Sequence, residues 1–341
     1  MPTQSDLTID VTKFHPSNVT EEVKKVNTFI ENVTKNGPKW DEVGAEKYRQ
    51  MRETGETPLP VPVYLSDAID ATLPSRDAGR DIPLRVFRPE NGLPSKGIYL
   101  HFHGGGFVLG THKHSDTPLK MYANKCQLTA ISVGYRLAPE DPYPAGINDC
   151  VDAAEYLIDH PEEYQAKLAL VGGESSGGCL AALTAFQLMR SRPQHQLAGL
   201  IFPYGWFDIS LGLPKVTSFT RPLVINLEAM QLFANAYAPN KEERRHPQLS
   251  PLYEDMQALA LQSPSLSLPP ALFLCGTNDP LLDDTLLMNM KWMIAGGESV
   301  LKIYPGAPHG FNAFPGKMGE DGKAVILQFM QEKLDAATQR N

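Results

Sequence analysis

The strongest constraint on the fold is a series of short apolar segments with almost no polar residues among them. Seven such segments follow one another along the chain, at 84–87, 98–102, 129–133, 168–171, 200–202, 271–275 and 300–304. Strands without polar alternation are buried on both faces, which is typical of a parallel sheet. Helical patterns, such as those at 149–159 and 179–189, separate several of them. The sequence therefore predicts an α/β fold with helices on both faces of a mostly parallel sheet.

Two other regions are predicted to form a helical cap. Apolar residues recur at three- and four-residue steps between 19 and 33, and a second helical stretch covers 41–53. The interval 206–250 is too long for a simple connection, and it contains a helix for which Asn226 is a plausible N-cap. We expect residues 1–55 to form an N-terminal cap segment, 206–250 to complete the cap, and 56–205 with 251–341 to form the core.

Charge and hydropathy exclude several classes of protein. Lys and Arg number 31 and Asp and Glu number 39, so the net charge of −8 disfavours binding to a phosphate backbone, and we expect no nucleic-acid partner. No stretch reaches eighteen apolar residues, and the first thirty residues lack an apolar run, which predicts a cytoplasmic protein without stable membrane insertion. The isolated cysteines favour buried thiols over a disulfide or zinc site; they are Cys126, Cys150, Cys179 and Cys275.

A glycine-flanked serine follows the apolar segment at 168–171 and precedes an apolar helix. The order is Gly173-Glu174-Ser175-Ser176-Gly177. A sharp turn between a strand and a helix leaves no room for a β-carbon two residues either side of the serine, and it presents the hydroxyl at an exposed, strained position. Ser175 is therefore the candidate nucleophile, and a solvent-exposed serine in a glycine-rich turn is the alternative.

A second glycine-rich sequence, His103-Gly104-Gly105-Gly106, directly follows the segment at 98–102. Consecutive glycines leave backbone N–H groups unshielded, so these can bind the oxygen that becomes negative when a carbonyl is attacked. The N–H of Ser176 would add a further donor. We predict an oxyanion hole made by these three glycines and Ser176, and we interpret His103 as a histidine that stabilises the loop by bonding to backbone.

A serine hydroxyl needs a base, and the base needs a carboxylate to hold its tautomer. Asp279 follows the segment at 271–275, and His309 follows the segment at 300–304 between Pro308 and Gly310. Both lie just past the carboxyl ends of predicted strands, where the active sites of open α/β sheets collect. We predict Asp279 and His309 as the pair; Asp283 and Asp284 are rival carboxylates that we interpret as structural.

Together these motifs resemble the hormone-sensitive-lipase-like family of α/β-hydrolase esterases. The resemblance also rests on Tyr135-Arg136-Leu137-Ala138-Pro139-Glu140, Tyr143-Pro144-Ala145, Ser250-Pro251-Leu252 and His309-Gly310-Phe311. It implies an eight-stranded sheet, a cap, no cofactor and hydrolysis of short- to medium-chain acyl esters. The chain departs from the usual Gly-Asp-Ser-Ala-Gly of the family in having Glu174 and Ser176, which affects the subfamily assignment. Plant gibberellin receptors resemble the family but lack the catalytic histidine, whereas His309 is present here.

The sequence thus predicts a serine carboxylesterase with a Ser175–His309–Asp279 triad, and no metal. Lactones, carbamates, aryl amides and acyl transfer to an alcohol use the same acyl-enzyme chemistry, and a receptor without turnover is the alternative from another class. Activity should fall as pH drops through the ordinary histidine range, about 6 to 7.

The helix near 325–334 either offers a homodimer contact or covers the sheet. Five cap aromatics divide about evenly between core packing and the walls of an apolar acyl pocket; they are Phe29, Trp206, Phe207, Phe233 and Tyr237.

Overall fold

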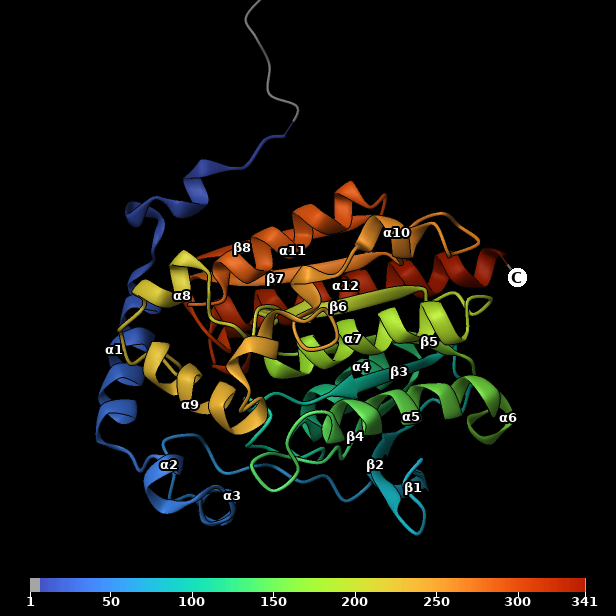
Figure 1. The fold of residues 1–341 in the computed structure, drawn as a ribbon, viewed down its shortest axis with the longest axis horizontal. Helices are drawn as coiled ribbons and strands as arrows, with labels where there is room; N and C mark the ends of the chain where they lie inside the picture. Colours follow the sequence, from blue (N-terminus) through green and yellow to red (C-terminus); the bar gives the residue numbers. More distant parts are fainter. Residues whose placement is uncertain (1–6, 341) are drawn as a thin grey trace, which may run out of the picture.

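A twisted sheet of eight strands forms the centre of the protein in the computed structural model, which describes residues 7–340 (Figure 1). The strand order is β1-β2-β4-β3-β5-β6-β7-β8. β1 and β2 pair antiparallel with their neighbours, and all the other pairs are parallel. The strands are β1 Ile69–Pro74, β2 Asp81–Phe87, β3 Ile98–Phe102, β4 Thr129–Val133, β5 Leu168–Gly173, β6 Gly199–Pro203, β7 Ala271–Asn278 and β8 Ser299–Pro308.

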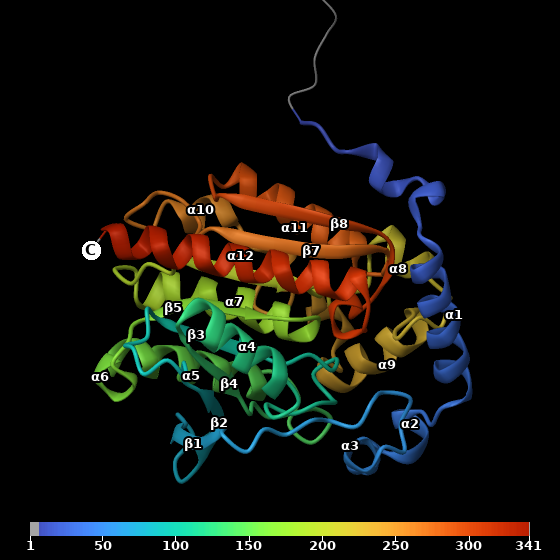
Figure 2. The same ribbon diagram turned by 180° about the vertical axis from the view of Figure 1, so that it is seen from behind.

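Helices cover both faces of this sheet. One face carries α5 (Ala145–Asp159), α7 (Ser176–Ser191) and α11 (Leu282–Ile294), and the opposite face, seen in Figure 2, carries α4 (Asp116–Cys126) and α12 (Lys317–Arg340). Each face has its own apolar core, because alternate residues of the central strands point to opposite sides. The predicted α/β architecture with a mostly parallel sheet is confirmed. The short helices α6 (Pro161–Tyr164) and α10 (Met256–Ala260) lie in connections.

Strand β1 was not among the predicted strands. It is the edge strand, and Leu73 is its single buried residue, so its sequence offers neither an apolar run nor a clear alternation. The other seven strands each include a predicted segment, and β2, β7 and β8 extend three to five residues beyond it. The helices predicted at 149–159 and 179–189 are also present, and both are longer than predicted. α5 begins at Ala145 and α7 begins at Ser176.

The N-terminal region packs beside the carboxyl ends of the strands (Figure 1). Helix α1 (Glu21–Asn36) is capped by Thr20, whose side chain accepts from the N–H of Val23. The helical stretch predicted over 41–53 is present but interrupted: Gly44, with φ +90°, separates α2 (Trp40–Val43) from α3 (Ala45–Thr54). The first six residues of the predicted cap segment lie outside the described part of the chain. Short 3-10 helices occur at Val11–Phe14, Pro16–Asn18, Lys241–Arg245, Pro251–Tyr253 and Phe311–Ala313.

The interval between β6 and β7 contributes α8 (Pro214–Ser218) and α9 (Leu227–Tyr237). Asn226 caps α9 as predicted, because its Oδ1 accepts from the N–H of Ala229 at 3.0 Å. In Figure 1, α9 lies beside α1 at the end of the sheet where β3, β5 and β7 have their carboxyl ends. Segments far apart in the sequence therefore meet above one edge of the sheet.

The remaining sequence predictions concern burial. All four cysteines are buried and unpaired, as expected. Helix α12 covers the sheet with its apolar face, since Ile326, Phe329, Met330 and Leu334 are buried; a homodimer stays a prediction. Among residues 7–340, no helix combines the length and the apolar character needed to cross a membrane.

Candidate active site

The turn from β5 into α7 holds Ser175 in a strained conformation. Its φ of 58° and ψ of −120° are rare for a residue with a β-carbon and are maintained only where the surroundings enforce them. Here the enforcing contact is close: a β-carbon at Gly173 or Gly177 would lie 2.3 or 2.0 Å from the carbonyl oxygen of Phe102. The two glycines thus let the turn pack directly on β3, and the serine projects from the top of the sheet.

Ser175, His309 and Asp279 form one hydrogen-bonded chain. The distance from Ser175 Oγ to His309 Nε2 is 2.9 Å, and the distance from His309 Nδ1 to Asp279 Oδ2 is also 2.9 Å. Asp279 is completely buried, and its Oδ1 accepts from the N–H of Leu281 at 2.9 Å. Because a carboxylate accepts at Nδ1, that nitrogen carries the proton of the neutral ring, and Nε2 is left free to accept from Ser175.

The rival carboxylates point elsewhere and organise the backbone beside the site. Asp284 Oδ1 accepts from the N–H groups of Phe207 and Asp208, each at 2.8 Å, and Asp283 Oδ2 accepts from the N–H of Lys215 at 2.8 Å. Burial, followed by the nearby Asp208, raises the pKa of Asp284 well above its ordinary value. Both residues therefore fasten the segment after β6 to the start of α11, which agrees with a structural role.

The glycine-rich loop lies against the serine turn. A β-carbon on Gly104 would lie 3.4 Å from Cβ of Ser175, so the loop and Ser175 are neighbours. In the described part of the chain, the N–H groups of Gly104, Gly105, Gly106 and Ser176 donate to no backbone acceptor. These four N–H groups are thus not used by backbone hydrogen bonds, and Gly104 lies against Ser175.

His103 stabilises this loop, as its interpretation from sequence proposed. The ring is buried, Nδ1 lies 2.8 Å from the carbonyl oxygen of Gly104, and the ring stacks on Tyr135 with centroids 4.3 Å apart. Tyr135 donates its hydroxyl to the carbonyl of His103 at 2.6 Å. Burial lowers the pKa of His103 to about 3, so the ring is neutral near pH 7 and donates to Gly104.

Glu174, the residue that departs from the family pattern, has a partner under the turn. Its Oε2 lies 2.8 Å from Nε2 of His101, and Nδ1 of His101 lies 3.0 Å from Oγ of Ser132. These three side chains connect β5, β3 and β4 beneath the site. Burial alone would raise the pKa of the Glu174 carboxyl. The charge and the hydrogen bond of the neighbouring His101 act against this effect, and the pKa lies below its ordinary value. The longer side chain therefore links the turn to the strand that carries the glycine loop.

A cavity of about 1320 Å³ opens above Ser175 and His309. Its walls come from α1, α2, α3, α9 and the glycine loop. Trp40 stacks on Phe233 with ring centroids 5.4 Å apart, and a β-carbon on Gly106 would lie 2.4 Å from the Phe233 ring. The apolar lining includes Phe29, Ile30, Val33, Trp40, Leu232, Phe233 and Phe314.

Of the five cap aromatics considered from sequence, Phe29 and Phe233 line this cavity. Trp206, Phe207 and Tyr237 are buried in the core instead. Sequence reasoning missed Trp40, because one aromatic residue in a four-residue helix gives no periodic signal. It also missed Arg49 of α3, which donates to the carbonyl of Val108 at 2.7 Å and to Glu140 at 2.6 Å, and so joins the N-terminal region to the glycine loop.

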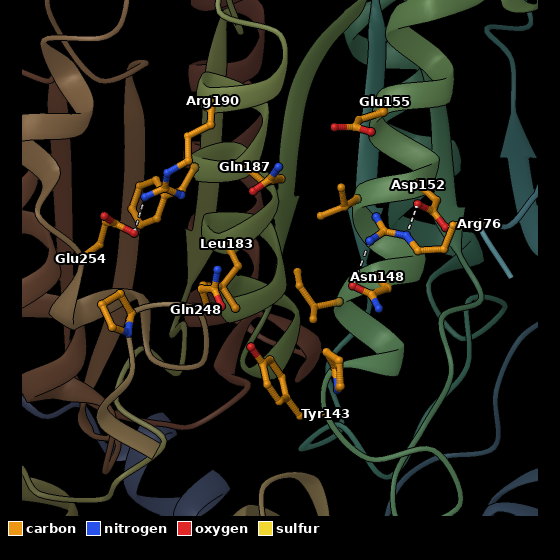
Figure 3. A pocket seen from close by; sticks show the side chains of 15 residues that line it. Arg76, Tyr143, Asn148, Asp152, Glu155, Leu183, Gln187, Arg190, Gln248 and Glu254 are labelled. Atoms are coloured by element: carbon orange, nitrogen blue, oxygen red, sulfur yellow. Dashed lines mark hydrogen bonds and ion pairs between the residues drawn. The ribbon is translucent and has the colours of Figure 1, made fainter. Parts of the chain in front are cut away.

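A second cavity, of about 690 Å³, lies between α5 and α7 (Figure 3). Four of its charged side chains form two ion pairs, Arg76 with Asp152 at 2.7 Å and Arg190 with Glu254 at 2.7 Å. None of the predicted site residues lines it. Among residues 7–340, no group of three or more His, Cys, Asp or Glu side chains is placed to hold a metal ion. The predicted chemistry is therefore concentrated in the larger cavity.

Sequence comparison places the chain among ester hydrolases. Residues 99–313 match the family described as alpha/beta hydrolase fold. An ethyl acetate hydrolase of Pseudomonas putida is 30% identical over 273 residues, which cover 78% of this chain and 82% of that protein. A protein of Schizosaccharomyces pombe named as a member of the AB hydrolase superfamily is 31% identical over 251 residues, covering 70% and 72% of the two chains.

Solved structures agree with the sequence matches. A hyperthermophilic esterase from the archaeon Pyrobaculum calidifontis superimposes with a TM-score of 0.77 and 26% identity, covering 90% of this chain and 97% of that one. An ester hydrolase from the metagenome of Lake Arreo, solved with a derivative of bipyridine phosphonate, gives a TM-score of 0.75 and 27% identity, covering 93% and 98%. The likeness therefore extends over nearly the whole chain.

Proposed function

The chain belongs to the alpha/beta hydrolase fold family, as a carboxylic ester hydrolase of its hormone-sensitive-lipase-like group, and from this premise we propose the residues that perform the reaction. Ser175 attacks the ester carbonyl while Nε2 of His309 takes the hydroxyl proton. Asp279 holds the ring in the required tautomer and stabilises the imidazolium that forms. The protonated His309 then gives its proton to the departing alcohol, which leaves an acyl-enzyme on Ser175.

The N–H groups of Gly104, Gly105, Gly106 and Ser176 are the proposed donors to the oxyanion. The negative oxygen forms at each attack on the carbonyl, first by Ser175 and then by water, so the same donors serve both halves of the reaction. In the second half His309 removes a proton from water and returns it to Ser175, which releases the acid. The observation that supports the proposal most is the hydrogen-bonded chain from Ser175 to Asp279 at the floor of the large cavity.

We further assign the cap to residues 1–55 and 206–250, and the core to 56–205 and 251–341. Helix α1 and helix α9 come from these two segments, and both line the cavity above Ser175. The apolar walls fit acyl chains of short to medium length, as the resemblance implied. The glycine loop lines the same cavity beside Ser175, so a bound ester group would meet the proposed donors there. A small-molecule ester is thus the substrate class that the cavity fits best.

The experiment is the initial rate of hydrolysis of p-nitrophenyl acetate, butyrate, octanoate and palmitate. The wild type is compared with Ser175→Ala and His309→Ala, with Ser218→Ala as the matched control because Ser218 lies exposed on α8. We expect rates that peak at short or medium chains, and a loss of at least about 1000-fold in both active-site variants. Comparable rates in Ser175→Ala and the wild type would refute the assignment.

Covalent labelling supplies an independent test. An organophosphonate that phosphonylates an activated serine should add one group per chain, and mass spectrometry should place it on Ser175. Labelling of another serine in the wild type, or unchanged labelling of Ser175 in His309→Ala, would contradict the assigned roles.

A further inference from the structure

Strand β8 bulges immediately before His309. β7 and β8 pair regularly up to Gly276 with Tyr304, and the next pair is Asn278 with Pro308. One residue of β7, Thr277, therefore faces three residues of β8, 305–307. Such bulges bend a strand and re-aim the side chain that follows, and they leave peptide groups without ladder partners. The direction of His309 thus depends on how the extra peptide groups are held.

Two side chains hold the peptide groups of Gly306 at the centre of this bulge. Its N–H donates to Oγ1 of Thr277 at 2.7 Å, and its carbonyl accepts from Nδ2 of Asn27 at 2.9 Å. Thr277 stands two residues before Asp279, whereas Asn27 belongs to helix α1, 279 residues away in the chain. The bulge is therefore completed from one side by the strand that carries the acid and from the other by the cap.

Gly306 occupies a position at which a residue with a β-carbon does not fit. Its φ of +71° is one that residues with a β-carbon rarely adopt, and a β-carbon there would lie 2.4 Å from Cγ1 of Val19. The N-terminal region thus packs directly on the bulge, through Val19 as well as through Asn27. Asn27 itself has only 4% of its surface exposed.

The amide of Asn27 is half satisfied. Its Nδ2 donates to Gly306, but its Oδ1 is buried without a hydrogen-bond partner. A buried polar atom without a partner destabilises a fold, so an apolar residue of similar size would suit packing alone at least as well. The role of Asn27 therefore lies in the hydrogen bond that its Nδ2 donates to Gly306, and not in a contribution to the free energy of unfolding.

From these contacts, and resting on the proposed function, we infer that Asn27 is a positioning residue for His309. It fixes the Gly306 carbonyl, and with it the bulge that aims the imidazole at Ser175 and Asp279. The hydrogen bond from Asn27 attaches α1 to the bulge and also fixes the backbone that carries His309. Docking of α1 therefore places the proposed base at the same time. The cap accordingly serves the chemical step in addition to lining the cavity.

The decisive variant is Asn27→Leu, which keeps the branched shape and removes both the donor and the unpaired oxygen, while leaving the Gly306 carbonyl without that donor. Because one unpaired buried oxygen replaces another, we expect its melting temperature to stay close to that of the wild type, while kcat for p-nitrophenyl butyrate falls about 10-fold and KM stays within about 2-fold. The rate of phosphonylation of Ser175 should fall by the same factor as kcat/KM. Asn32→Leu, at an exposed position of α1, is the matched control and should match the wild type in both rates.

A purely structural role for the Asn27–Gly306 hydrogen bond predicts that melting temperature and activity fall together in Asn27→Leu, and that result would overturn the inference. A role in packing alone predicts a kcat within about 2-fold of the wild type in the folded variant, which would overturn it equally. If the leucine variant does not fold, Asn27→Ala decides by kcat against KM, because the cavity it leaves lowers the melting temperature in either case. Failure of the proposed function is distinguishable, because it would leave the wild type itself without phosphonylation at Ser175.

Discussion

Helices α1 and α7 have the same length of 16 residues, yet they are built into the molecule in opposite ways. Thirteen residues of α7 are buried, compared with three of α1. The serine turn at the start of α7 is held by backbone packed on backbone, as the approach of Gly177 to Phe102 demonstrates. The difference teaches that the proposed nucleophile, Ser175, is held by close backbone packing in the core.

Helix α1 depends instead on a small number of side-chain contacts. Glu31 pairs with Arg221 at 2.7 Å, Glu22 accepts from the N–H of Lys317 at 2.9 Å, and Asn27 donates to Gly306. Large apolar side chains of the cap remain exposed, including Phe29 at 62%. Changes in the cap should therefore alter which ester is accepted before they alter the fold, with the Asn27 contact as the exception.

The largest contrast is expected from adding one methyl group to each region. Gly177→Ala places a β-carbon about 2.0 Å from a backbone oxygen, so we expect at least a 100-fold loss of kcat/KM or an insoluble protein. Gly44→Ala, in the cap, meets no atom within 4 Å and costs only the backbone strain of φ +90° and ψ 143°, about 1–3 kcal/mol. Esterase rates and melting temperatures of the two variants provide the check. Equal losses of esterase rate and melting temperature in the two variants would contradict the view that the core tolerates less change than the cap.

Acid should destabilise the core through His103. Burial lowers its pKa to about 3, whereas histidine in an unfolded chain titrates near 6.5. Between these values the unfolded state binds a proton that the folded state does not, so the free energy of unfolding falls as pH falls. From pH 7 to 4.5 we expect a loss of about 2–3 kcal/mol from this ring.

Urea unfolding at the two pH values measures this loss. His103→Asn should show a smaller drop than the wild type, while His15→Asn, which alters an exposed ring in the N-terminal region, should keep the full drop. An unchanged pH dependence in His103→Asn would argue against a buried, neutral His103 as the source.

The smallest effect is expected where the cap meets the substrate. Trp40→Ala removes the ring that stacks on Phe233 and lengthens the cavity, so the octanoate-to-acetate rate ratio should rise about 10-fold while the acetate rate changes by less than about 3-fold. Val43→Ala is the control, because Val43 lies in the same helix outside the cavity lining. An unchanged octanoate-to-acetate ratio would show that Trp40 does not determine the acyl-chain preference.

The parts of the molecule that the sequence predicts well are those with local signals. Apolar runs identify the central strands, and glycine spacing identifies the serine turn, because each depends on residues that are neighbours in the chain. Ser175, Asp279 and His309 could be chosen because each follows a strand, and parallel strands bring their carboxyl ends to one edge. The structure places these three side chains within hydrogen-bonding distance.

The parts that could not be predicted depend on contacts across long separations or on weak patterns. The exposed edge strand β1 lacks an apolar run, and the break at Gly44 is one positive φ within an otherwise helical stretch. Nothing local marks Asn27, since its partner lies 279 residues away. The pairing of Glu174 with His101 likewise needs the register between β3 and β5.

The four buried cysteines have a practical consequence. Burial raises the pKa of Cys126 to about 12 and that of Cys150, Cys179 and Cys275 well above the ordinary value, so the folded chain presents almost no thiolate to an alkylating agent. On unfolding, all four become ordinary reactive thiols. Unfolding can therefore be followed by alkylation of the native cysteines. The number of iodoacetamide groups added per chain, measured by mass spectrometry, reports the fraction of chains that have unfolded.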